Sequence, residues 1–311
     1  MPPSVFVITG ILSVQVGAGL AGRMFGQVTP AAMTGLRLWT SAAIMGALGG
    51  GGVARCVRGM LRDRAWREAA LVLAFGVTLA VMNFSFYQAI ARIPLGVAVT
   101  IEFLGPLALA VASSRRLIDL LWVGLAAAGV ALLSDGWASL AGPGMPRPAG
   151  VAGSGAGTAL AGVVFALIAA AGWCAYILLS ASTGRRFAGS SGLVIAMVLA
   201  AVVVTPAAVG YGPGGDGSLL RPGVIGVGVA VGLLSSVIPY RLELEALRRI
   251  PARIFGIWMS LEPAIGALVG LVLLGEALAA REWAAVGCVI TACAGAARAS
   301  GRAGHAPLPE S

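Results

Sequence analysis

The stretch that decides the fold is Asn83–Pro106, NFSFYQAIARIPLGVAVTIEFLGP. It predicts two membrane helices joined by a tight hairpin at Arg92-Ile93-Pro94, because long apolar runs flank a proline that cannot continue a helix. One glutamate, Glu102, lies inside the second of these helices.

Part of this stretch occurs a second time in the chain. Ala89–Pro94, AIARIP, is matched 157 positions later by Ala246–Pro251, ALRRIP, and Pro106 is matched by Pro263 at the same offset. A hairpin that occurs twice in a hydrophobic chain indicates duplicated halves, which are typical of transporters.

The composition indicates a membrane protein. The 311 residues are 59% hydrophobic and only 11% charged, whereas about a quarter of the residues of a soluble domain are charged. A net charge of +9 would suggest nucleic acid as the partner of a soluble protein. Here the basic residues lie in short gaps between apolar runs, so we expect the lipid bilayer as the partner and no nucleic acid.

A helix needs roughly 20 mostly apolar residues to cross the bilayer. Ten stretches meet this length, namely 4–22, 30–50, 69–91, 95–113, 117–134, 158–181, 190–210, 223–246, 252–274 and 282–299. The long Gly/Pro-rich connection separates five helices from five. We therefore divide the chain into a first five-helix repeat at 1–134, an external loop at 135–157, a second five-helix repeat at 158–299 and a polar cytoplasmic tail at 300–311.

Arginine counting gives the orientation, because cytoplasmic loops carry an excess of basic residues. With the N-terminus inside, the inner connections and the tail hold 14 arginines and the outer connections hold five. Both termini are then cytoplasmic, and the two hairpins lie on opposite sides of the membrane. The predicted fold is an all-α polytopic membrane protein with ten transmembrane helices in two inverted five-helix repeats, and with its site near mid-membrane.

Two ionisable residues lie at matched depth inside predicted spans. Arg37 and Glu102 are each about 10 Å from the outer surface, at 1.5 Å of rise per residue. Charges within a span usually face a cavity or a partner. We interpret the two as a pair, which is either a static link between helices or an external gate and proton relay.

The prolines of the repeat place two glutamates at predicted helix breaks. Pro106 frees the carbonyl group of Glu102, and Pro263 directly follows Glu262, which lies near the midplane. Transporters expose backbone dipoles to a ligand at such breaks. The alternative is a proline kink that only shapes the packing.

Further polar and aromatic residues are candidates for the same cavity. Gln15, Trp173 and Tyr176 lie at a similar depth, and Asn83 with Tyr87 would lie nearer the outer mouth. For each of these the alternative is a packing or interfacial role.

Other charges have simpler interpretations. Arg241, Glu245 and Arg249 follow one another at i, i+4 spacing, which predicts an interfacial charge ladder. Glu276 is expected to close the ninth helix at the outer surface, where a charge costs little free energy.

Catalytic and metal centres have no basis in the sequence. The four cysteines form no CxxC pair, and the only histidine, His305, lies in the polar tail. No P-loop, metal-ligand cluster or nucleophile elbow is present. We expect no enzyme activity, cofactor or metal, and transport would depend on an ion gradient or on the gradient of the substrate.

Several segments resemble a known family: MTGLRL at 33–38, MNFSFYQAIARIPLGVAVTIEFLGPLALAV at 82–111, GWCAYIL at 172–178 and IPYRLELEALRRIPARIFGIWMSLEPAIGALVGLVLLGEAL at 238–278. They resemble EamA-type members of the drug/metabolite transporter superfamily, and within it most closely the bacterial threonine/homoserine exporters. The resemblance implies ten helices in two inverted halves in the inner membrane, and export of small metabolites by a proton-coupled or facilitated mechanism.

The family motif matches this sequence at Gln15, Arg37, Glu102, Trp173, Tyr240, Glu243, Glu262, Pro263 and Glu276. The hypothesis is an exporter of small neutral amino acids, with Glu262, Gln15 and Tyr240 at the substrate. Glu243 joins Arg37 and Glu102 in the gate or proton relay. Arg241 and Glu245 depart from the uncharged residues expected in the threonine/homoserine type, which leaves the substrate open.

Two alternatives remain at this point. One is an exporter of other small compounds such as purines, sugars or cationic drugs. The other is a membrane scaffold or sensor that transports nothing, although the tail carries no recognisable partner domain.

Overall fold

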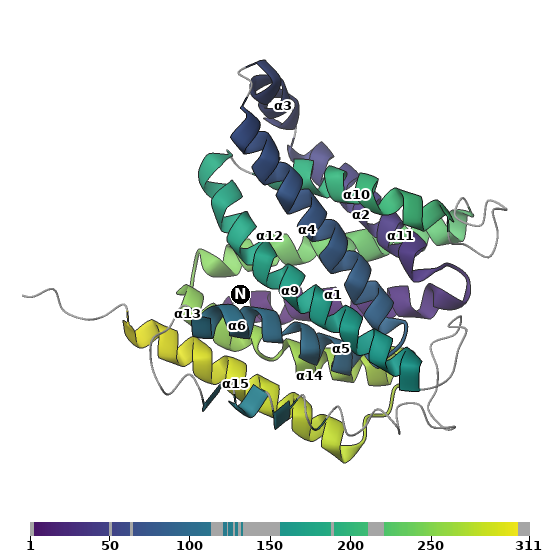
Figure 1. Ribbon diagram of the computed structural model, residues 1–311, viewed down its shortest axis with the longest axis vertical. Helices are drawn as coiled ribbons and strands as arrows, with labels where there is room; N and C mark the ends of the chain where they lie inside the picture. Colours follow the sequence, from purple (N-terminus) through teal and green to yellow (C-terminus); the bar gives the residue numbers. More distant parts are fainter. Residues whose placement is uncertain are drawn as a thin grey trace, which may run out of the picture.

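The computed structural model describes residues 3–49, 52–62, 65–112, 156–187, 190–210 and 221–303, with isolated positions between 121 and 132. All regular elements in these ranges are helices (Figure 1). The expected span at 117–134, the loop at 135–157 and the tail at 300–311 lie largely outside the described residues.

The first half of the chain folds into six described α-helices and a short 3₁₀ turn at Met24–Gly26. The helices are α1 (Pro3–Arg23), α2 (Pro30–Gly49), α3 (Gly52–Arg62), α4 (Trp66–Ile90), α5 (Leu95–Glu102) and α6 (Leu104–Ala112).

The second half contains seven described α-helices: α9 (Ala156–Arg186), α10 (Ser191–Gly210), α11 (Pro222–Gly232), α12 (Ile238–Leu247), α13 (Ala252–Met259), α14 (Glu262–Val269) and α15 (Ala280–Ala303). Two π-helical segments, η3 (Leu233–Val237) and η4 (Gly270–Leu274), continue α11 and α14.

Seven helical stretches of the described chain are long and apolar enough to cross a membrane: Pro3–Gly26, Trp66–Ile90, Leu95–Ala112, Gly157–Arg186, Ser191–Val209, Pro222–Leu247 and Ile254–Leu274. Helices α2 and α15 coincide with two further expected spans. Large apolar side chains such as Leu73, Val202 and Val272 are not covered by protein. Such an apolar exterior suits contact with lipid.

Helix α3 corrects the expectation of a simple loop between the second and third spans. Its apolar side chains recur at helical spacing, and Val53, Cys56 and Met60 pack against the core beside α10. Arg58 lies on its exposed face. With 11 residues it is too short to span a bilayer, and it projects from the bundle at the top of Figure 1.

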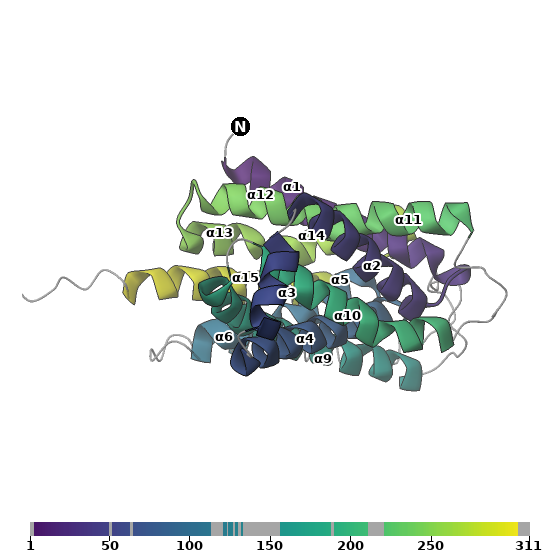
Figure 2. The ribbon, with the colours of Figure 1, turned by 90° about the horizontal axis from the view of Figure 1, so that it is seen from above.

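The two halves pack into one another. Helix α4 lies against α9, α2 against α10, α5 against α14, and α1 against α12 and α14. Glycines permit the closest crossings: a Cβ atom on Gly96 would lie 2.7 Å from the Cβ of Ala267, and one on Gly105 would lie 2.1 Å from the carbonyl oxygen of Ala170. The first turn of α1 and the last turn of α15 lie at the same end, at the left of Figure 2.

The hairpin that occurs twice in the sequence has the same local structure in both copies. The prolines that precede α5 and α13 have nearly equal dihedral angles, φ −54° and ψ 143° at Pro94, and φ −57° and ψ 144° at Pro251. Each helix has eight residues, and their C-cap residues, Phe103 and Ser260, are again 157 positions apart.

Candidate functional site

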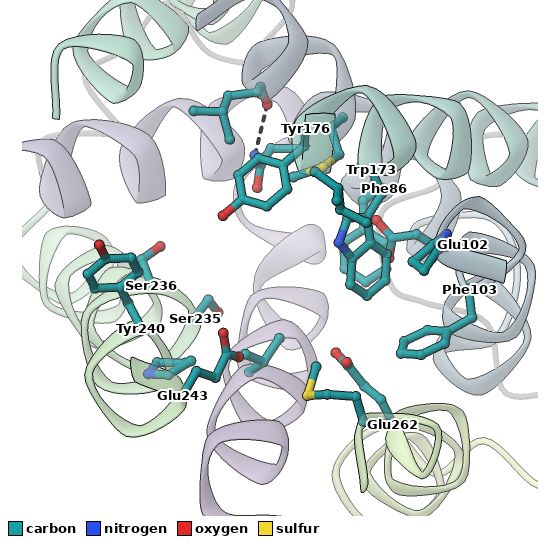
Figure 3. Close-up of a pocket in the computed structure, with 18 of the residues that line it drawn as sticks. Phe86, Glu102, Phe103, Trp173, Tyr176, Ser235, Ser236, Tyr240, Glu243 and Glu262 are labelled. Atoms are coloured by element: carbon teal, nitrogen blue, oxygen red, sulfur yellow. Dashed lines mark hydrogen bonds between the residues drawn. The ribbon is translucent and has the colours of Figure 1, made fainter. Parts of the chain in front are cut away.

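A cavity of about 530 Å³ lies in the middle of the bundle (Figure 3). Ten of the residues singled out from the sequence line it: Gln15, Arg37, Asn83, Glu102, Pro106, Trp173, Tyr176, Tyr240, Glu243 and Glu262. Residues far apart in the sequence therefore meet at one site. Figure 3 shows Glu102, Glu243 and Glu262 approaching the same space from three different helices.

A glutamate lies at the cavity at each of the two helix breaks, between α5 and α6 and between α13 and α14. Glu102 is the last residue of α5, and Glu262 is the first residue of α14. Pro106 lies in the first turn of α6 and Pro263 is the second residue of α14, where a helix tolerates a proline without losing a hydrogen bond. Pro263 is buried and does not line the cavity.

Glu262 is paired with Gln15 across the bundle. The amide Nε2 of Gln15 donates a 3.0 Å hydrogen bond to Oε1 of Glu262, and both side chains are buried. The second oxygen of Glu262 and Oε1 of Gln15 have no hydrogen-bond partner. Because buried polar atoms are normally satisfied, two unused acceptors at the cavity wall mark a place for a donor from a ligand.

Arg37 supplies the cationic side of the site. Its Nη2 donates to the carbonyl oxygen of Ser235 at 3.1 Å, and its guanidinium lies 5.5 Å from the ring centroid of Tyr87. The expected ion pair with Glu102 is not formed, since none of the salt bridges among the described residues involves Arg37. Tyr87 is fully buried and supports Arg37 from behind, outside the cavity lining.

The segment that binds Arg37 was missed in the sequence. Pro239 has no amide hydrogen, so the carbonyl group four residues earlier, that of Ser235, lacks a helical donor and accepts from Arg37. The chain adjusts by the π-helical segment η3, in which the amide of Ile238 reaches Leu233. Such π-bulges are frequent at functional sites. The signal in the sequence for this segment was the pair Ser235 and Ser236, shortly before Pro239 in an apolar run.

Two helices of the first half form hydrogen bonds with this π-helical segment. Ser13 on α1 donates to the carbonyl oxygen of Leu234 at 2.7 Å, and the hydroxyl of Ser41 on α2 lies 3.0 Å from that of Ser236. Ser235 and Ser236 thereby face the cavity from a fixed backbone.

Aromatic rings form the opposite wall of the cavity. Phe103 and Trp173 meet edge to face with centroids 4.9 Å apart, and Tyr176 packs on Phe75. Phe86 and Phe103 were not singled out in the sequence, because aromatic residues in apolar runs are usually core residues. Asn83 lines the same wall and donates to the carbonyl oxygen of Leu79 at 2.8 Å.

The charge ladder near the end of α12 is formed only in part. Arg249 donates to Glu245 through Nε at 3.0 Å, and Arg248 lies 3.6 Å from the same carboxylate. The expected contact between Arg241 and Glu245 is not among the salt bridges of the described residues. Arg241 instead lines a second, smaller crevice together with Tyr240.

The expectation that Glu276 lies at the surface is wrong. Its side chain is 6% exposed, and its Oε2 accepts the backbone amide of Leu95, the first residue of α5, at 2.8 Å. Burial raises the pKa of this carboxyl group to about 7, and the hydrogen bond from Leu95 opposes the rise. A helix N-terminus is a favourable place for a carboxylate, which explains why the group is tolerated there.

The lining of the cavity extends toward one end of the bundle. It runs from Gln15 and Glu262 to Met45, Phe255 and Ala297, which lie near the ends of their helices. At the opposite end, by contrast, the first hairpin is buried, with exposed fractions of 1% at Ile93 and 0% at Leu95. The second hairpin, with Arg248 and Arg249, is exposed. The two copies of the hairpin therefore differ in environment although they have the same backbone conformation.

No group of three or more His, Cys, Asp or Glu side chains that could hold a metal ion occurs in the described part of the chain. The polar groups of the cavity are three carboxyls, one guanidinium, amides and hydroxyls. This set suits a small ligand with both donors and acceptors.

A membrane-embedded helical bundle with discontinuous helices around a polar central cavity is the architecture of a secondary transporter. The EamA-like transporter family matches residues 160–298. The threonine/homoserine exporter RhtA of Escherichia coli K12 is 37% identical over 299 residues, which cover 94% of this chain and 90% of that protein. RhtA of Salmonella typhimurium SL1344 is 36% identical over the same shares of the two chains.

This chain belongs to the EamA-like transporter family, as its sequence motifs indicated, and it is a multi-pass protein of the inner membrane. A solved crystal structure of a protein with 19% identity shares the fold, with a TM-score of 0.57 over 96% of this chain and 98% of that one. The relatives are named as exporters and not as enzymes.

Proposed function

We propose that this protein exports small neutral amino acids of the threonine and homoserine type from the cytoplasm by alternating access. The observation that carries the proposal is the pairing of opposite chemistries in one cavity. Arg37 presents a cation, and Glu262 with Gln15 presents unpartnered acceptors. An amino acid is a zwitterion, so its carboxylate suits the guanidinium and its ammonium suits the acceptors.

The similarity to known proteins also supports the substrate assignment. The relatives that are 36–37% identical to this chain, over 90% of their own length, are named threonine/homoserine exporters. In this proposal Glu262, Gln15 and Tyr240 contact the substrate, and Asn83, Trp173 and Tyr176 complete the pocket. Tyr87 acts through Arg37. Glu102, Glu243 and Arg37 form the gate and proton relay.

The proposed architecture is ten transmembrane helices in two inverted repeats, 1–134 and 158–299, joined by an external loop at 135–157. Both termini, including the tail at 300–311, are then cytoplasmic. The arginine distribution and the twofold hairpin support this arrangement. In this orientation the cavity reaches the cytoplasmic end, and the buried first hairpin closes the outer end.

The proposed coupling is to protons or to the substrate gradient alone. Three carboxyl groups, Glu102, Glu243 and Glu262, line the cavity and are the groups available to carry a proton with the substrate. The test is flux: purified protein in sealed liposomes loaded with labelled threonine, with and without an imposed pH gradient. Release that the gradient accelerates supports proton coupling, and release indifferent to it supports a facilitator.

No release of threonine from folded protein would overturn the substrate assignment. The volume of about 530 Å³ lies within the range of pockets for drug-sized ligands, which favours export of larger metabolites or drugs as the second candidate. Competition by purines, sugars and cationic compounds against threonine flux separates the two candidates.

A further inference from the structure

We infer that Glu276 is the latch that closes the outer end of the pathway, by capping α5 and so positioning Glu102 in the cavity. The inference rests on the proposed function in one respect, since the closed end is taken as the outer one. The bond itself joins Leu95 N–H to Glu276 Oε2 at 2.8 Å, across 181 positions of the sequence.

The turn that carries Glu276 is built to point its side chain back into the bundle. Gly275 has a φ of +71°, a left-handed conformation that favours glycine. The amide of Glu276 then donates to the carbonyl oxygen of Gly270 at 3.1 Å, six positions earlier, at the end of the π-helical segment η4. The backbone of Glu276 is thus held by contacts other than the one between its side chain and α5.

Gly270 leaves the space that this carboxyl occupies. A Cβ atom there would lie 2.5 Å from Oε2 of Glu276 and 3.4 Å from the Cβ of Leu95. Any side chain at this position would have to displace the carboxyl group from the helix terminus. A second link at the same end joins α1 to the same turn, because Arg23 Nε donates to the carbonyl oxygen of Leu273 at 2.7 Å.

The capped helix connects the closed end to the cavity. Helix α5 runs from Leu95 to Glu102 in eight residues, about 11 Å along its axis. Its first amides have no helical acceptor of their own, so an external acceptor at Leu95 fixes the helix end. Movement of this end also moves Glu102, the residue at its other end. Opening of the pathway to the outside therefore requires the bond between Glu276 and Leu95 to break.

The direct test is hydrogen exchange, measured by mass spectrometry on the full-length protein in nanodiscs. Glu276→Leu removes the acceptor, and we expect roughly tenfold faster exchange in peptides covering 91–98, as for loss of a helix cap. Glu276→Gln keeps an acceptor oxygen and should restore protection. The second hairpin, at 248–251, is already exposed and serves as the internal reference.

Gly270→Ala provides an independent variant that leaves Glu276 in place, in case Glu276→Leu does not fold. Its matched control is Gly287→Ala on α15, where an added Cβ would meet nothing within 4 Å. Unchanged protection of 91–98 in Glu276→Leu, or in Gly270→Ala, overturns the latch. Equal loss of protection in Glu276→Gln and Glu276→Leu overturns it as well, since a retained acceptor would then have no effect.

A transport measurement separates a latch from a merely structural residue. A broken latch raises the fraction of outward-open protein, so the KM for external threonine in counterflow should fall by roughly tenfold in Glu276→Leu and remain unchanged in Glu276→Gln. A structural defect would lower kcat without lowering the external KM, and that result overturns the latch. If the wild-type protein moves no threonine, the proposed substrate fails, whereas the exchange result still decides the latch.

Discussion

Gln15 Nε2 lies 3.0 Å from Glu262 Oε1, and this hydrogen bond joins α1 to the first residue of α14 at the wall of the cavity. Two acceptors of this pair remain unused, because Oε1 of Gln15 and the second oxygen of Glu262 are both unpartnered. The pair therefore leaves two acceptors available to the donors of a ligand.

We expect Glu262→Gln to reduce threonine efflux from proteoliposomes at least tenfold, because the ammonium of the substrate loses its charged acceptor. A hydrogen bond to a charged group is worth about 1.5–3 kcal/mol, which corresponds to roughly 10- to 150-fold. The chain should remain folded, since the two amides can still pair. Glu68→Gln, at an exposed pair with Arg186, is the control and should transport normally. Efflux at the wild-type rate in Glu262→Gln would remove Glu262 from the substrate site.

Arg37→Lys should raise the KM for threonine roughly tenfold despite the retained charge. The guanidinium donates to Ser235 while lying over the ring of Tyr87, and a lysine ammonium cannot reproduce this planar arrangement. Counterflow kinetics provide the measurement. Arg58→Lys on the exposed face of α3 is the matched control. Equal KM values for Arg37→Lys and wild type would show that Arg37 does not hold the substrate carboxylate.

The repeated hairpin could be predicted from the sequence because its determinants are local. Pro94 and Pro251 set the entry to α5 and α13 directly, and the same spacing separates the C-cap residues of the two helices, Phe103 and Ser260. Hydropathy placed most spans to within a few residues, since the apolar length that crosses a bilayer is fixed by its thickness.

The site could be predicted only in part because its contacts join distant segments. The residues of the cavity were recognised by polarity inside apolar runs, but their partners were not. Arg37 was assigned to Glu102, whereas the carbonyl group that Pro239 leaves free lies closer in the fold. Glu276 was placed at the surface because hydropathy does not show that the left-handed turn at Gly275 directs its side chain inward.

Gly17→Ala tests whether the π-helical segment must remain in place for transport. A Cβ atom on Gly17 would lie 2.2 Å from Oγ of Ser235 and 3.3 Å from its backbone nitrogen, so the hydroxyl must rotate away and the segment must move by a few tenths of an ångström. Overpacking of this kind costs about 1–3 kcal/mol, and the shift also displaces the acceptor of Arg37. We expect a lower Tm and a loss of efflux. Gly226→Ala on α11, where nothing lies within 4 Å, should change neither quantity. Normal efflux in Gly17→Ala would show that the position of Ser235 does not limit transport.

The stability of the protein should fall between about pH 4.5 and 7 because of Glu276. Its pKa is about 7 in the folded protein against an ordinary value of 4.5, so the folded state binds the proton more tightly than the unfolded state does. The stabilisation is fully present below pH 4.5 and is lost as the pH rises through 7, by up to about 3 kcal/mol. The side chain in Glu276→Gln stays uncharged at every pH. In nanodiscs, the Tm of this variant should therefore decrease less than that of wild type between pH 5 and 7.5. Parallel Tm profiles for the two proteins would show that the carboxyl group of Glu276 titrates in the folded state as it does in the unfolded chain.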